Sequence, residues 1–90
     1  MEQPVCGNWH SKNEKYVTFL NNTDKDAHIT KYKDNEFPFK GSENITVLKR
    51  GANGPGKQTV ELKDLPSGHT YYYWVDVCKT EGAPQNVTIP

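Results

Sequence analysis

The strongest strand-forming run in the chain is Tyr71-Tyr72-Tyr73-Trp74-Val75-Asp76-Val77-Cys78. Aromatic and β-branched residues favour strands because their side chains pack well on a pleated, half-buried surface. Successive side chains of a strand point to opposite faces, so residues 71, 73, 75 and 77 share one face. We predict a strand over 71–78 that buries this face and turns Tyr72, Trp74 and Cys78 outward.

Other short strand-forming runs are separated by polar or glycine-rich turns. They cover residues 16–20, 28–33, 44–49, 59–63 and 86–89, and a first strand is expected around Val5. No window of a dozen residues carries apolar side chains at helical spacing. Pro38 restricts 37–39 to a sheet edge or a loop, and the glycines of 51–56 suit a hairpin connection. About seven short strands predict an all-β fold, a two-sheet antiparallel β-sandwich.

The composition is that of one small domain, residues 1–90. Hydrophobic residues make up only 33% of the chain and aromatic residues 11%, so we expect a thin core that contains many rings. Eleven basic and eleven acidic residues give zero net charge, which provides no field that would attract nucleic acid. The chain has no apolar run of about 18 residues, so no membrane span is expected. Residues 1–12 do not resemble a signal peptide. We expect a monomer.

The two cysteines, Cys6 and Cys78, lie near opposite ends of the chain. Their spacing fits neither a redox pair nor half of a zinc site. A disulfide between them would stabilise a thin core by about 4 kcal/mol in the chain-entropy model. We therefore predict this disulfide; the alternative is two free thiols in a cytosolic protein.

Three sequons for N-linked glycosylation begin at Asn21, Asn44 and Asn86. Composition alone can also generate sequons, because threonine-rich strands here follow asparagine-rich turns. Together with the predicted disulfide, however, they favour a secreted, glycosylated chain.

The residues typical of catalysis and metal binding show no useful spacing. His10, His28 and His69 are scattered, and no Gly-x-Ser-x-Gly motif is present. Asp24 and Asp26 would need further calcium ligands that cannot be placed from the sequence. We predict no catalytic residue, no metal and no cofactor, and thus no enzyme.

The outward pair on the strand over 71–78 is the strongest candidate for a binding surface. Tyr72 and Trp74 would provide a large contact area for a protein or a sugar. Trp9, held nearby through Cys6, would join them in binding. Alternatively, the segment that carries Trp9 folds over the pair and covers it.

Residues 65–71, Leu-Pro-Ser-Gly-His-Thr-Tyr, resemble the turn before the sixth strand of fibronectin type III and immunoglobulin-like modules. In those families a tyrosine six residues after a leucine forms the tyrosine corner, in which its hydroxyl bonds back across the turn. The resemblance covers about half of the chain and implies an immunoglobulin-like sandwich, with Leu65 and Tyr71 as the corner pair.

Three functions fit these observations. The first is a small secreted protein that binds a macromolecule, such as an effector or virulence protein that acts on a host; in size and all-β character the chain resembles the fungal MAX-type effectors, whose cysteines are closer in sequence. The second is a carbohydrate-binding or accessory module of a larger extracellular protein. The third is an intracellular structural domain with reduced thiols.

Overall fold

The chain folds into two β-sheets in the computed structural model, which describes residues 1–12, 14–41, 43–78 and 82–90. Within these residues the elements are β1 (Glu2–Pro4), β2 (Asn8–His10), β3 (Tyr16–Asn21), β4 (Ala27–Tyr32), a 3-10 turn η1 (Lys33–Asn35), β5 (Ile45–Val47), β6 (Gly56–Glu61), β7 (Thr70–Val75) and β8 (Gln85–Thr88). No described helix has the length and hydrophobicity needed to cross a bilayer. The all-β prediction is confirmed.

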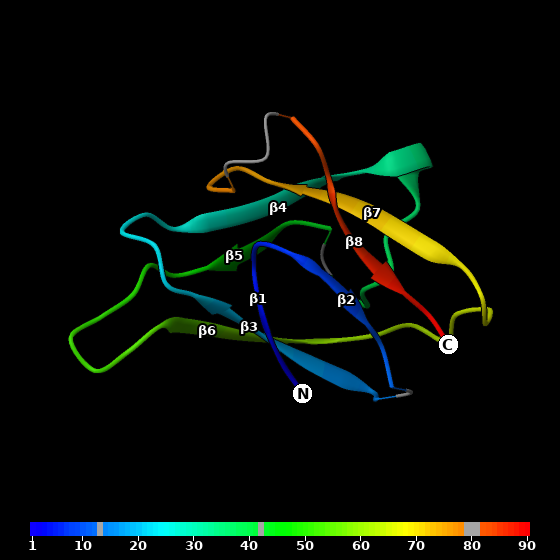
Figure 1. The fold of residues 1–90 in the computed structure, drawn as a ribbon, viewed down its shortest axis with the longest axis horizontal. Coiled ribbons are helices and arrows are strands. Elements are labelled where there is room, and N and C mark those ends of the chain that lie inside the picture. The colour runs from blue at the N-terminus through cyan, green and yellow to red at the C-terminus, as the bar shows by residue number, and fades with distance from the viewer. Residues whose placement is uncertain (13, 42, 79–81) are drawn as a thin grey trace.

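The two sheets pack against each other as a sandwich (Figure 1). One sheet has the order β1-β3-β6 and the other the order β2-β8-β7-β4-β5. The strand expected around Val5 is two short strands, one in each sheet, and the chain crosses between the sheets at residues 5–7. β1 pairs with β3, and β2 with β8, in parallel. The sandwich is therefore not purely antiparallel.

A cluster of aromatic rings lies in the core, as the sequence predicts. Phe19, Phe39 and Tyr73 have no exposed surface, and their rings meet edge to face with centroids 5.6–6.2 Å apart. The indole Nε1 of Trp9 donates a 2.8 Å hydrogen bond to the Tyr73 hydroxyl inside this cluster. These large rings thus pack together with the buried aliphatic side chains of both sheets, such as Val17 and Ile29.

The strand expected over 71–78 is shorter than predicted. β7 begins at Thr70 and ends at Val75, and the Cys78 N–H donates to the Val75 carbonyl in the turn that follows. The alternation therefore stops at Val75, and Cys78 is half-buried beyond the strand. Tyr71 is buried with its ring against His69, at a centroid distance of 4.6 Å. Its hydroxyl makes no hydrogen bond with a described residue, so the bond of a tyrosine corner is not seen.

The glycine-rich segment 51–56 is not a hairpin connection, because β5 and β6 belong to different sheets. Main-chain hydrogen bonds between Gly51 and Gly54 close a tight turn in the loop that projects at the lower left of Figure 1. The loop then enters β6 at Gly56, where a Cβ would lie 1.6 Å from the Leu48 carbonyl oxygen. Only glycine therefore fits at position 56, where the chain passes the Leu48 carbonyl.

The predicted disulfide between Cys6 and Cys78 is confirmed, with the two Cα atoms 5.5 Å apart. It joins the β1–β2 crossing to the turn after β7 across a sequence separation of 72. One covalent bond thus ties the two N-terminal edge strands to the central strand of the larger sheet.

Candidate functional site

The outer face of β7 carries Tyr72 and Trp74, as the sequence predicts. Burial alternates along the strand: Tyr71, Tyr73 and Val75 are buried, whereas Tyr72 and Trp74 are only half-buried. The indole Nε1 of Trp74 donates a 2.8 Å hydrogen bond to the Gly82 carbonyl. This hydrogen bond fixes the Trp74 ring.

Each outer ring has a lysine ammonium over it. Lys31 Nζ lies 4.8 Å from the centroid of the Trp74 ring, and Lys33 Nζ lies 4.8 Å from that of Tyr72. Contacts of this kind stabilise by about 0.5–1 kcal/mol at exposed sites. We call these four residues (Lys31, Lys33, Tyr72 and Trp74) the aromatic–lysine stripe.

A β-bulge in β4 produces this pairing. Ile29 is opposite Val75, but the next pair is Lys31 with Trp74, because the register shifts between Ile29 and Lys31. Regular pairing would place Thr30 opposite Trp74 instead. Bulges often redirect a side chain in this way near functional surfaces. The two lysines are not predicted for this site, because the register shift has no clear signal in the neighbouring sequence.

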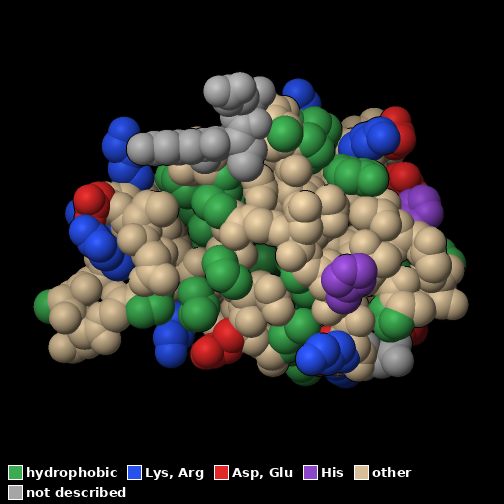
Figure 2. Space-filling view, viewed as in Figure 1, with side chains coloured by type: hydrophobic (Ala, Val, Ile, Leu, Met, Phe, Trp, Pro, Cys, Tyr) green, Lys and Arg blue, Asp and Glu red, His purple; other side chains and the backbone are tan. Residues whose placement is uncertain are grey.

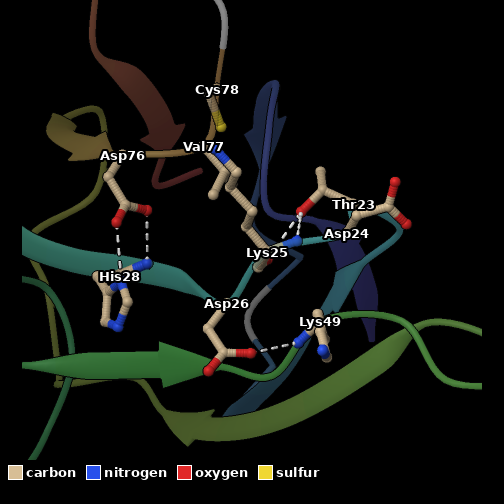
Figure 3. Close-up of a pocket in the computed structure, with 9 residues that line it drawn as sticks. All are labelled: Thr23, Asp24, Lys25, Asp26, His28, Lys49, Asp76, Val77 and Cys78. Carbon is tan, nitrogen blue, oxygen red and sulfur yellow. Dashed lines mark hydrogen bonds and ion pairs between the residues drawn. The ribbon is translucent and has the colours of Figure 1, made fainter.

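An open groove of about 990 Å³ adjoins the end of β7 (Figure 3). Asp76 and His28 lie on its wall: Asp76 accepts a 2.8 Å hydrogen bond from the His28 main-chain N–H, and its other oxygen is 2.7 Å from His28 Nδ1. Burial alone would raise the pKa of Asp76, but the hydrogen bonds and the proximity of His28 lower it below its ordinary value. Asp76 therefore stays ionised at neutral pH and holds the His28 side chain at the wall of the groove.

The other carboxylates of the groove also have partners. Asp24 pairs with Arg50 Nε at 2.8 Å, and Asp26 accepts a 2.9 Å hydrogen bond from the Lys49 main-chain N–H. Among the described residues, no group of three or more His, Cys, Asp or Glu side chains is placed to hold a metal ion.

The prediction that Trp9 contributes to a binding surface is wrong. Trp9 is only 4% exposed and lies in the core, where its ring meets Phe19 edge to face. The alternative, in which its segment covers Tyr72 and Trp74, is also not what the structure shows, since Lys31 and Lys33 lie over those rings. Trp9 is the middle residue of the three-residue strand β2. So short a strand shows too little alternation of polar and apolar residues to predict which sheet face its side chain takes.

The three sequon asparagines have different environments. Asn21 has no exposed surface, and its amide donates to the carbonyls of Lys25 and Val47 at 2.9 Å. A glycan there is incompatible with this fold, so the prediction for Asn21 is wrong. Asn44 is exposed. Asn86 is half-buried and stands opposite Tyr72 in the register of β7 and β8.

Charged side chains of both signs surround the face of the molecule seen in Figure 2, with hydrophobic side chains between them. This mixed distribution agrees with the zero net charge. Comparisons with family models, curated proteins and solved structures gave no match. The stripe is therefore interpreted from its own geometry.

Proposed function

We propose that the protein acts outside cells and binds a partner protein through the aromatic–lysine stripe. The observation that carries this proposal is the pair of outer rings, Tyr72 and Trp74, each held beside a lysine ammonium on neighbouring strands. Tyrosine and tryptophan dominate the binding energy of many protein interfaces. The disulfide supports an extracellular location, because such bonds persist in oxidising compartments.

The lysines support a partner surface with acidic side chains next to apolar ones. Carboxylates on the partner would pair with Lys31 and Lys33, and its apolar side chains would cover the exposed parts of the rings. Such a surface, on a small disulfide-linked domain, suits an effector that acts on a host protein. Glycan binding is the second candidate, supported by the two outer rings, but sugars stack on open ring faces and the lysines occupy part of those faces.

A photo-crosslinking experiment tests the proposal. A photoreactive phenylalanine analogue replaces Tyr72 in one variant and Tyr16 in a second, and each protein is incubated with extracellular fluid from its natural environment. Tyr16 is the matched control because it is an exposed tyrosine of the other sheet with Lys15 Nζ 5.8 Å from its ring. We expect a specific crosslinked protein from position 72 and none from position 16.

The crosslinked protein is then purified and its Kd measured. We expect the Tyr72→Ala/Trp74→Ala variant to bind at least 30-fold more weakly, because the loss of even one hot-spot residue costs about 2 kcal/mol or more. Tyr16→Ala should change the Kd less than threefold. The proposal fails if the double variant, shown to be folded by circular dichroism, binds as tightly as the unmodified protein. It also fails if only an oligosaccharide array retains the protein.

A further inference from the structure

An open corner of the sandwich lies between β5 and β6. A groove of about 460 Å³ runs there, with Asn44, Ile45 and Thr46 on one side and residues 58–61 on the other. Val60 and Gln58 of β6 are opposite the buried Val17 and Phe19 of β3, so they face the interior of the sandwich. Gln58 is nevertheless exposed, because the short β5 does not reach far enough to cover it.

The same corner leaves main-chain groups of β6 without a strand partner. β3 is the sheet neighbour of β6 in the described structure, and the Leu62 N–H donates toward it, to the Lys15 carbonyl. Hydrogen bonding alternates along an antiparallel strand, so the groups of Lys57 and Thr59 point the other way. The segment at Lys40 covers the end of this edge, where its N–H donates to the Glu61 carbonyl. Within the described residues no strand pairs with the edge at 57–59, where the Thr59 carbonyl accepts a 3.3 Å hydrogen bond from the Gln58 side chain.

We propose that Asn44 carries an N-linked glycan that lies over this groove and covers the open edge of β6. Asn44 is an exposed groove residue and begins the sequon completed by Thr46. Exposed strand edges invite pairing with other chains, and a bulky, hydrophilic glycan prevents it. The inference rests on the extracellular location in the proposed function.

The reaction requires a lipid-pyrophosphate-linked oligosaccharide as the second substrate. The amide Nδ2 of Asn44 bonds to C1 of the first N-acetylglucosamine, the bond between C1 and the pyrophosphate oxygen breaks, and Nδ2 releases one proton. The lipid pyrophosphate is the leaving group.

The proposal assigns the glycan to Asn44 alone. Asn21 donates its amide to two carbonyls inside the fold. A glycan at Asn86 would lie beside Tyr72, its opposite residue on β7, and would cover the aromatic–lysine stripe.

The first experiment locates the glycan on the natural protein. The chain is captured from extracellular fluid and from cell extract, and its peptides are treated with peptide N-glycosidase in ¹⁸O water, which labels each formerly glycosylated residue. We expect label at residue 44 and none at 21 or 86. Extracellular chain without label at 44 overturns the inference and leaves the proposed function standing, whereas chain found only in cells overturns both.

The second experiment tests coverage of the groove by hydroxyl-radical footprinting before and after native deglycosylation. We expect at least twofold more labelling of the peptide with residues 57–61 after deglycosylation, and no change at Tyr72. In the Thr46→Ala variant, which lacks the sequon but keeps Asn44, labelling of the peptide with residues 57–61 should equal that of the deglycosylated protein. Thr88→Ala, which removes the sequon at Asn86, should behave like the unmodified protein. Equal labelling with and without the glycan overturns the inference.

Discussion

Replacing Tyr73 with phenylalanine removes the one polar atom that satisfies the buried Trp9 indole. Tyr73 has no exposed surface, and its hydroxyl accepts the 2.8 Å hydrogen bond from Trp9 Nε1. An unsatisfied buried donor costs about 1–3 kcal/mol. We therefore expect Tyr73→Phe to lower the free energy of unfolding by about 2 kcal/mol, and to lower Tm by about 10 °C for a domain of this size.

Tyr71→Phe is the matched control, since Tyr71 is buried on the same face of β7 and its hydroxyl makes no hydrogen bond with a described residue. Urea unfolding followed by tryptophan fluorescence should show a change below about 0.5 kcal/mol for this variant. If Tyr73→Phe costs no more than Tyr71→Phe, the assignment of Trp9 to a hydrogen-bonded core is refuted.

Three further predictions concern residues whose roles the structure defines. Asn21→Ala should cost about 2–3 kcal/mol in urea unfolding, because the buried Val47 carbonyl loses its amide donor; a neutral substitution would show that Asn21 is not structural. Gly56→Ala should prevent folding or cost more than about 3 kcal/mol, since the new Cβ meets the Leu48 carbonyl at 1.6 Å; a native circular dichroism spectrum with unchanged Tm would contradict this. Burial, together with the charge of Glu43, raises the pKa of Tyr32 from 10.0 to about 12. The unfolded phenol ionises first, so the contribution of Tyr32 to the free energy of unfolding should be constant below pH 10 and fall between pH 10 and 12; a stability that rises in this interval would show the opposite sign.

Much of this fold is predictable from the alternation of inward and outward side chains along each strand, because this alternation depends only on neighbouring residues. The pattern over 71–75 correctly separates buried Tyr73 from outward Tyr72 and Trp74. The disulfide was also predictable, because one long-range bond between the only two cysteines suits a thin core. The strand end at Val75 was missed, because Asp76 and Val77 continue the alternation although they form a turn.

The candidate site was only half predictable, since its lysines depend on pairing between distant strands. Nothing in the sequence near Thr30 shows the bulge that places Lys31 opposite Trp74. The burial of Asn21 likewise depends on Val47, which belongs to another sheet. The prediction that the glycines of 51–56 serve a hairpin missed the role of Gly56, whose lack of a side chain lets the chain pass the Leu48 carbonyl between the sheets.

The disulfide between Cys6 and Cys78 keeps this sandwich with its thin core folded. The most direct test of this claim is urea unfolding of the oxidised protein and of the Cys6→Ser/Cys78→Ser variant. The bond closes a loop with a sequence separation of 72, so the account predicts that the variant loses about 4 kcal/mol of stability and about 20 °C in Tm. A variant that unfolds within about 1 kcal/mol of the oxidised protein would contradict the claim.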